Sequence, residues 1–313
     1  MNPQHHWPII SFPEIQDTLA TLHHWIQIIG KVRLKTMPWQ NHSWHTTLYV
    51  TPTGFSTHGI PFEGRVFEID LNFKDHKLVV SCSNYGSEEM DLQPMTVAKF
   101  YKSLFKMMEH MGIHVTIHAV PNEMEPAIPF AENTINRSYD PHAAQTIWKA
   151  FLAASEVFTR FRSSFIGKSS PVHLFWGAFD LAVTRFSGNT APLHPGGMPN
   201  MPLEVMQEAY SQEVSSAGFW PGSKDHPTPF FYSYAYPTGD DFKDQPVLPE
   251  AAFYSEDFGE FILNYEDVVS SKAPDDRLFE FLQSTYEAAA NTSDWNRASL
   301  EKGDYINGKK KSP

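Results

Sequence analysis

The spacing of apolar residues along the chain predicts four helices. Each candidate segment repeats apolar residues every three or four positions, as one buried helix face requires. Ser11 and Glu14 have the spacing of a capping box before the first segment, and Gly30 suits its C-terminal cap. Asp140, followed by proline, marks the start of the third segment, and Gly167 suits its end. The predicted helices cover residues 12–29, 96–111, 140–164 and 275–290.

Between these helices the apolar period changes to two, which predicts strands. Phe67, Ile69 and Leu71 alternate with acidic and amide residues, a pattern typical of a sheet with one wet face. Proline, asparagine and glycine gather over 120–140, a candidate linker, and over 190–202, a candidate loop. The predicted strands are 44–51, 54–60, 65–73, 77–83, 113–118, a hairpin over 172–187, then 208–217, an aromatic loop at 218–222, and 229–236.

These elements predict an α+β fold of mostly antiparallel sheets flanked by helices. We expect residues 1–295 to form a single compact unit, followed by a flexible tail over 296–313. Residues 12–118 and 142–290 share the order helix, Ile-Gly-Lys, hairpin, strands, helix, which suggests two pseudo-symmetric halves. Convergence on a helix cap followed by a hairpin is the alternative explanation of that shared order.

Composition and charge narrow the classes of protein. The 313 residues carry a net charge of −12 and a single cysteine, Cys82, which excludes a disulfide framework and favours a reducing, cytoplasmic location. We expect neither a signal peptide nor a membrane partner, because no leader pattern and no run of about 18 apolar residues occurs. Clustered cations occur only at Lys309–Lys311, so nucleic acid is not an expected partner. A homodimer is left open.

Several familiar chemistries are not supported. The Gly-Lys-Ser at 167–169 resembles the end of a phosphate loop, but Arg162 stands where that loop needs a glycine. Histidines four apart between 110 and 118 are interrupted by Gly112, so we assign no metal ligand. No Gly-x-Ser-x-Gly occurs, and Cys82 lies within a strand pattern, where a buried inert thiol is expected. The sequence indicates no particular cofactor.

The segment 171–188 carries the strongest candidate chemistry. It is apolar enough to be a buried hairpin, yet it contains His173, Asp180 and Arg185, each costly in a core unless paired or used. We predict that Asp180 and Arg185 are both largely buried. Because they are an odd step apart, a turn or bulge is needed for direct pairing. The group is either a prepared site or an internal ion pair that fixes the packing.

The candidate site extends beyond this segment. We predict that its groups surround a common cleft. The predicted acid–base residues are His173, Asp180 and Glu213, and the predicted ligand-binding residues are Arg185, Lys168, Tyr210 and Trp220, with Arg33, Asn41 and His45 in the analogous places of the first half.

The predicted function is to bind, and in its stronger form to transform, a small polar or anionic metabolite in an aromatic-lined cleft. Whether the protein is an enzyme is left open. The alternatives are a non-enzymatic interaction or scaffold protein and a carbohydrate-binding module. Enclosed polar groups would favour the first, a flat exposed aromatic patch the second, and parallel exposed tryptophan faces the third.

The chain also resembles a widespread bacterial family of unknown function, from about Trp7 to Trp295. The resemblance lies in the segments Asn41–Val50, Ser170–Gly188 and Ser215–Gly222. Asn189 stands where the family usually has arginine, and Gln212 where it usually has histidine, which weakens any role built on those two groups. The resemblance implies one cooperative unit and brings no established activity, substrate or cofactor.

Overall fold

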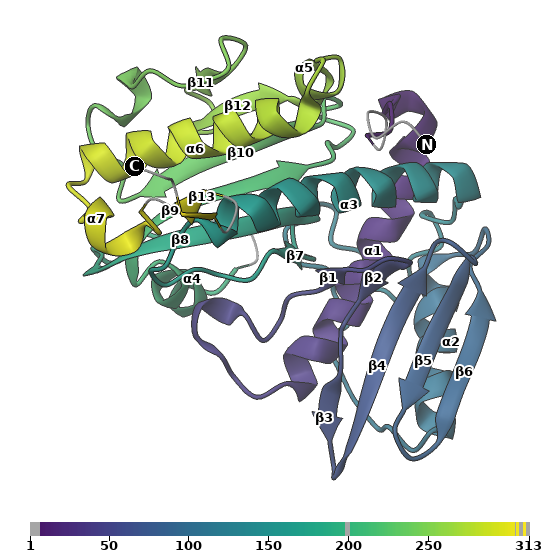
Figure 1. The fold of residues 1–313 in the computed structure, drawn as a ribbon. Coiled ribbons are helices and arrows are strands. Elements are labelled where there is room, and N and C mark those ends of the chain that lie inside the picture. The colour runs from purple at the N-terminus through teal and green to yellow at the C-terminus, as the bar shows by residue number, and fades with distance from the viewer. Residues whose placement is uncertain (1–6, 198–200, 304, 307–308, 311–313) are drawn as a thin grey trace.

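The computed structural model describes residues 7–197, 201–303, 305–306 and 309–310. They form two six-stranded antiparallel sheets flanked by helices, which confirms the predicted α+β class (Figure 1). The helices are α1 (Phe12–Thr36), α2 (Val97–His110), α3 (Pro141–Ser163), α4 (Leu203–Ala209), α5 (Tyr265–Val269), α6 (Pro274–Thr292) and α7 (Arg297–Leu300), with 3-10 turns η1 (Asn41–Ser43) and η2 (Phe242–Asp244).

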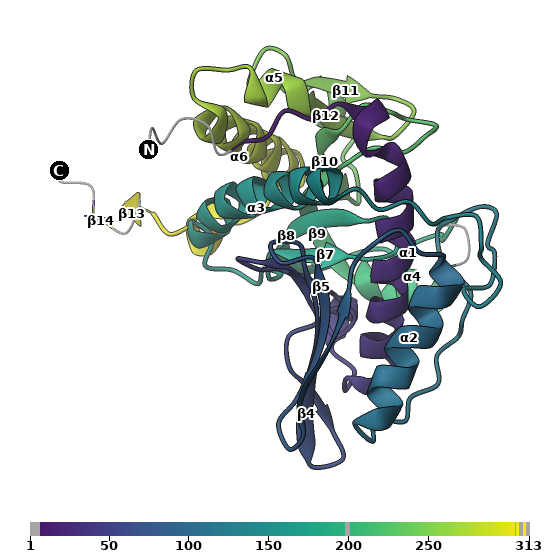
Figure 2. The same cartoon turned by 90° about the vertical axis from the view of Figure 1, so that its right-hand side faces the viewer.

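The first sheet has the strand order β1-β2-β4-β5-β6, with β3 added to β4. Helices α1 and α2 lie along one of its faces (Figure 2). Phe67, Ile69 and Leu71 of β4 are buried, and the residues between them are half-buried, as the alternation predicted. The strands are β1 (Tyr49–Val50), β2 (Gly54–Ser56), β3 (Ile60–Phe62), β4 (Arg65–Asn72), β5 (Lys77–Cys82) and β6 (Gly86–Asp91).

The second sheet has the strand order β7-β8-β9-β10-β12-β11. Helices α3 and α6 pack on one face of it, which we call the helix face, and the opposite side is the outer face. The predicted hairpin is present as β7 and β8. The strands are β7 (His173–Phe175), β8 (Asp180–Thr190), β9 (Gln212–Trp220), β10 (Phe230–Tyr236), β11 (Phe253–Ser255) and β12 (Glu260–Asn264), and a separate pair comprises β13 (Tyr305–Ile306) and β14 (Lys309–Lys310).

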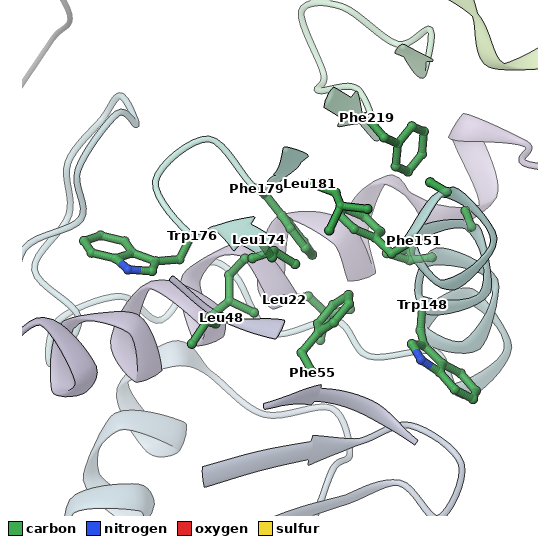
Figure 3. Packing of buried hydrophobic residues seen from close by; sticks show 14 of the residues in the cluster. Leu22, Leu48, Phe55, Trp148, Phe151, Leu174, Trp176, Phe179, Leu181 and Phe219 are labelled. Atoms are coloured by element: carbon green, nitrogen blue, oxygen red, sulfur yellow. The ribbon is translucent and has the colours of Figure 1, made fainter. Parts of the chain in front are cut away.

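The two sheets meet at one antiparallel bridge. The backbone N–H of Leu48 donates to the carbonyl of Leu174 at 2.9 Å, and the N–H of Leu174 donates back at 2.8 Å. Helices α1 and α3 pack against each other beside this bridge. Side chains from both halves fill the space between them, among them Phe55, Phe151 and Phe179 (Figure 3). One hydrophobic cluster therefore runs through both sheets.

Both halves show the order helix, antiparallel strands, helix that the sequence predicted. The Ile-Gly-Lys correspondence, however, is not structural. Gly30 lies inside α1, which continues to Thr36, whereas Gly167 follows the end of α3 at Ser163. Neither glycine is the helix cap that was expected. Duplication of residues 12–118 as 142–290 stays a prediction that rests on element order alone.

Three strand predictions are wrong in detail. Residues 113–118 are irregular: Ile113 and Ile117 are buried as the alternation requires, but no neighbouring strand pairs with the segment. Only Tyr49–Val50 of the predicted strand 44–51 is a strand. The predicted strand 208–217 is split between the end of α4 and β9, which continues through the supposed aromatic loop to Trp220. The alternation of apolar and polar residues indicates an extended, half-buried chain, whereas a β-strand also needs a hydrogen-bonded partner strand.

The predicted linker and tail boundaries also need correction. Within 120–140, Phe130 and Asn133 are fully buried, so this irregular segment is packed into the fold. Helix α7 and an antiparallel bridge between Phe165 and Glu301 hold the chain against the body beyond residue 296, where the tail was expected to begin. The sequence reading also missed β6, α4, β11, β12 and α5.

The packing between α1 and the β7–β8 turn can be tested by substitution of Gly30. A Cβ atom at this position would lie 2.1 Å from Cδ1 of Trp176, so the indole sits directly on the helix backbone. Gly30→Ala should destabilise the protein, since overpacking costs about 1–3 kcal/mol and the gain in helix propensity is only about 1 kcal/mol.

The control is the same substitution in a Trp176→Ala background, measured by denaturant unfolding. With the indole removed, Gly30→Ala should stabilise that variant by about 1 kcal/mol. The same sign of effect in both backgrounds would contradict the close-packing explanation.

Candidate functional site

Asp180 lies on the outer face of the second sheet, at the start of β8. Strand pairing places Gly218 of β9 and Tyr232 of β10 on the same face. The Tyr232 hydroxyl donates a short hydrogen bond to Asp180 Oδ2. A Cβ atom at Gly218 would lie 2.2 Å from Cζ of Tyr232, so the tyrosine ring reaches Asp180 by lying flat over this glycine. The Gly-Phe-Trp-Pro-Gly segment therefore contributes a glycine that makes room for the site.

Two further carboxyls and two further tyrosines belong to this site. Tyr210 and Tyr234 share a hydroxyl–hydroxyl hydrogen bond of 2.9 Å. Burial and the charge of Asp180 raise the pKa of Glu123 to about 7 and that of Glu260 to about 8. We call the six residues Asp180, Tyr232, Tyr210, Tyr234, Glu123 and Glu260 the Asp180 cluster.

The protonation of the cluster follows from its burial. Burial raises the pKa of Asp180 to about 6, although the Tyr232 hydrogen bond acts in the opposite direction. Burial also raises the pKa of Tyr232 and Tyr210 well above the usual value for tyrosine, with a further increase from the Asp180 charge at Tyr232 and from the Tyr234 hydrogen bond at Tyr210. The tyrosines therefore stay neutral, and the three carboxyls change charge between about pH 6 and pH 8. Such groups can accept and return protons near neutral pH.

The turn that precedes Asp180 is held from the first half of the chain. On α1, His23 Nε2 lies 2.7 Å from the Gly177 carbonyl, and Gln27 donates to the same oxygen at 3.1 Å. Trp220 Nε1 donates to the Ala178 carbonyl at 3.1 Å. These contacts fix Phe179 at φ 59°, a left-handed conformation that is costly for a bulky residue. The turn thus presents the Asp180 carboxyl from a rigid support.

His173 shares the outer face with Asp180. It pairs with Ala182 across β7 and β8, and it is fully buried against the edge of the Phe175 ring, 4.6 Å between centroids. Neither ring nitrogen has a hydrogen-bond partner among the described residues. Burial lowers the pKa of His173 to about 3, so its ring is neutral.

Arg185 is buried, as is Asp180, which confirms the burial prediction. The two do not pair, because Arg185 points to the helix face. Its guanidinium lies 3.4 Å from the ring centroid of Phe161 and 4.3 Å from that of Tyr286, and it donates to Ser164 Oγ at 3.0 Å. Burial lowers its pKa to about 9. Arg185 therefore stabilises the packing of α3 and α6 on the sheet and does not line the Asp180 cluster.

The other predicted residues lie elsewhere. Glu213 shares the helix-face parity of β9 and accepts from Asn189 Nδ2 at 3.2 Å. Lys168 contacts His42 and Gln212, at the opposite end of β8 from Asp180. The first-half residues do not reach Asp180 either: Arg33 donates to the Thr57 carbonyl, Asn41 begins η1, and His45 Nδ1 contacts the Gln40 backbone.

Sequence reasoning missed most of the Asp180 cluster. It named Asp180 and Tyr210 but not Glu123, Glu260, Tyr232 or Tyr234. One signal was available: the segment 230–236 carries tyrosine at every second position, which places three hydroxyls on one face of a strand. Nothing in the sequence pattern indicated that Glu123 and Glu260 would approach Asp180, because these contacts depend on loop paths.

Two surface clefts lie away from these residues. One, of about 670 Å³, is lined by Glu14, Asp17, Lys99 and Arg137 with their neighbours. The other, of about 450 Å³, lies beside Arg65 at β3 and β4. Neither contains a predicted site residue, so the shared cleft stays a prediction. No group of three or more metal-ligating side chains is found in the part of the chain that the structure describes.

The comparisons with known proteins agree with the resemblance seen in the sequence. A family model described as a family of unknown function (DUF5996) matches residues 7–302. No curated protein and no solved structure matches the chain. No helix within the described residues is both long enough and apolar enough to cross a bilayer.

The raised pKa of Asp180 predicts how stability depends on pH. The folded protein holds this proton up to about pH 6, whereas the unfolded chain releases it near pH 3.8. Stability should therefore be full below about pH 4 and fall as the pH rises toward 6, by on the order of 3 kcal/mol for this group. Glu123 and Glu260 should extend the decline to about pH 8.

Asp180→Asn should remove the contribution of Asp180 and so make the decline between pH 4 and pH 6 shallower, with the rest of the decline due to Glu123 and Glu260, as measured by urea unfolding at each pH. The exposed Asp257→Asn is the matched control and should leave the slope unchanged. An identical slope in Asp180→Asn and the wild type would show that Asp180 ionises normally.

Proposed function

Because the chain belongs to the DUF5996 family, whose function is unknown, we propose a function from the Asp180 cluster. At this cluster the protein binds a small amine-bearing cation and exchanges protons with that ligand. The supporting observation is that three carboxyls lie within one largely buried group. None of the three forms an ion pair with lysine or arginine among the described residues. A cationic ligand would supply the missing positive charge.

The aromatic residues of the cluster suit the same ligand. Tyr232 and Tyr234 stack at 6.1 Å between centroids, and both are half-buried, so part of each remains open to solvent. Aromatic faces attract an ammonium group by about 0.5–2 kcal/mol, and tyrosine oxygens accept its hydrogen bonds. The rigid support behind Asp180 keeps these groups in place before binding.

The sequence predicted a small polar or anionic ligand, and this proposal replaces the anionic alternative. Arg185 contacts the helix face, and Lys168 is engaged with His42 and Gln212, so neither cation faces Asp180. An anion at the cluster would face three carboxyls without compensation. A polar ligand is retained, and its charge is reversed.

Binding should strengthen as the pH rises. The carboxyls are neutral below about pH 6 and become charged in turn up to about pH 8. A bound cation favours the charged carboxylates, so binding at pH 7 should release protons. The cytoplasmic location and a homodimer stay predictions.

The test is isothermal titration calorimetry with matched probes: n-butylamine, tetramethylammonium, butyrate and glucose. We expect heat from the two cations only, with at least tenfold tighter binding at pH 8 than at pH 6. Binding of butylamine in two buffers of different ionisation heat should report the released protons.

Tyr232→Phe and Asp180→Asn are the informative variants. Each should weaken butylamine binding at least tenfold, whereas Asp257→Asn should not. Binding of glucose alone would favour the carbohydrate-binding alternative. If none of the four probes binds, the alternative of an interaction protein would be favoured. Its first candidate contact residues are the exposed Phe253 and Phe258 at the edge of the second sheet.

A further inference from the structure

A second polar group lies on the outer face at the other end of β8. It consists of Lys168 after α3, His42 and Trp44 at η1, Phe186 of β8 and Gln212 at the start of β9, and we call it the Lys168 cluster. Phe186 lies six positions along β8 from Asp180, which is about 20 Å along the strand. The proposed cation site does not use any of these residues.

The central contact joins an amine to a base. Lys168 Nζ donates a short hydrogen bond to His42 Nε2 and a second one to Gln212 Oε1 at 3.1 Å. His42 Nδ1 lies 3.0 Å from the Ala209 carbonyl. A carbonyl can only accept, so the hydrogen is assigned to Nδ1, and the lone pair on Nε2 faces the lysine. Amine, base and orienting carbonyl thus stand in the order that activated nucleophiles require.

The histidine is held in a strained conformation. His42 and Ser43 have φ of 55° and 56°, in the left-handed region that residues with a Cβ seldom adopt. The backbone N–H of His42 is fixed by Glu208 Oε1 of α4 at 2.8 Å. Residues of α4 therefore hold both parts of His42, because Glu208 fixes its backbone N–H and the Ala209 carbonyl contacts its ring. Strain that the surroundings maintain in this way is typical of functional positions.

Burial of Lys168 favours its neutral form, whereas two aromatic rings and the charge of Glu208 act in the opposite direction. Its Nζ lies 4.8 Å from the ring centroid of Phe186 and 5.8 Å from that of Trp44, and the side chain is half-buried. Burial lowers the pKa of Lys168, and burial together with the Lys168 charge lowers that of His42. Lys77 and Lys243 differ, because each is paired with a carboxylate.

We propose that Lys168 is a nucleophilic amine that condenses with the carbonyl group of a small aldehyde or ketone to form an imine, with His42 as its proton acceptor. A neutral Nζ attacks the carbonyl carbon and a C–N bond forms, while the C=O π bond breaks. One nitrogen proton passes through His42 Nε2 to the carbonyl oxygen, which gives the carbinolamine. The second nitrogen proton follows the same route to the hydroxyl group, which leaves as water when the C=N bond forms, so His42 is regenerated and no oxidant or reductant is consumed.

The aromatic rings beside Lys168 indicate which class of carbonyl compound would fit. Phe186 and Trp44 flank the amine, and Phe186 is itself buried against the His42 ring, 4.5 Å between centroids. Trp44 is only half-buried, so an aromatic aldehyde can stack on its ring while the carbonyl carbon meets Nζ. Benzaldehyde is therefore a suitable probe.

The experiment traps the imine in the full-length protein. Benzaldehyde and sodium cyanoborohydride are added at pH 7, and the benzylated lysines are located and timed by peptide mass spectrometry. Lys168 should react at least tenfold faster than the exposed Lys99 and Lys149, which serve as internal references. A Lys168 rate equal to or below theirs would overturn the proposal.

His42→Asn tests the role of the base, since asparagine tolerates the left-handed backbone at this position. It should reduce the Lys168 rate to that of the reference lysines and move the pH profile of labelling toward theirs. Unchanged labelling in a folded His42→Asn protein would remove His42 from the mechanism. If this variant does not fold, the wild-type ratio of Lys168 to Lys99 labelling still decides the proposal. Lys168→Arg should abolish labelling at this position.

Discussion

The fold depends on the junction between the two sheets. Each sheet has one apolar face covered by two helices, and the sheets touch through the Leu48–Leu174 bridge while α1 packs on α3. This arrangement joins both cores into a single hydrophobic cluster. It also brings α1 against the β7–β8 turn, where Gly30 admits the Trp176 indole and His23 and Gln27 hold the Gly177 carbonyl.

In the second sheet, the side chains that stabilise the packing and those of the candidate sites point to opposite faces, because successive residues of a strand alternate between its two faces. Arg185, at an odd position of β8, is buried among aromatic rings of α3 and α6, whereas Asp180 and Phe186, at even positions, face the outer side. The buried guanidinium can keep its charge because carbonyl and hydroxyl acceptors and aromatic faces surround it. The outer face is left free to carry carboxyls whose ionised forms reduce stability.

Both polar clusters need residues from each half of the chain. Glu123 follows α2 in the first half, yet its pKa is raised by burial and by the charge of Asp180 in the second half. His42 and Trp44 follow α1 and contact Lys168, which follows α3. Neither cluster would form in a half that folded alone. The irregular segments near 41–46 and 120–140, which carry these residues, are therefore as important for the clusters as the strands beneath them.

The sequence by itself determined the α+β class, the starts of α2 and α3, the alternation of β4 and the burial of Asp180 and Arg185. These properties depend on the spacing of apolar residues and on capping groups a few positions away. The tertiary structure decided that residues 113–118 lack a strand partner, that Gly30 admits an indole instead of ending a helix, and that Asp180 meets Tyr232 and not Arg185. Local spacing shows which side of an element is apolar, whereas the partner of a buried polar group depends on which distant elements pack against that side.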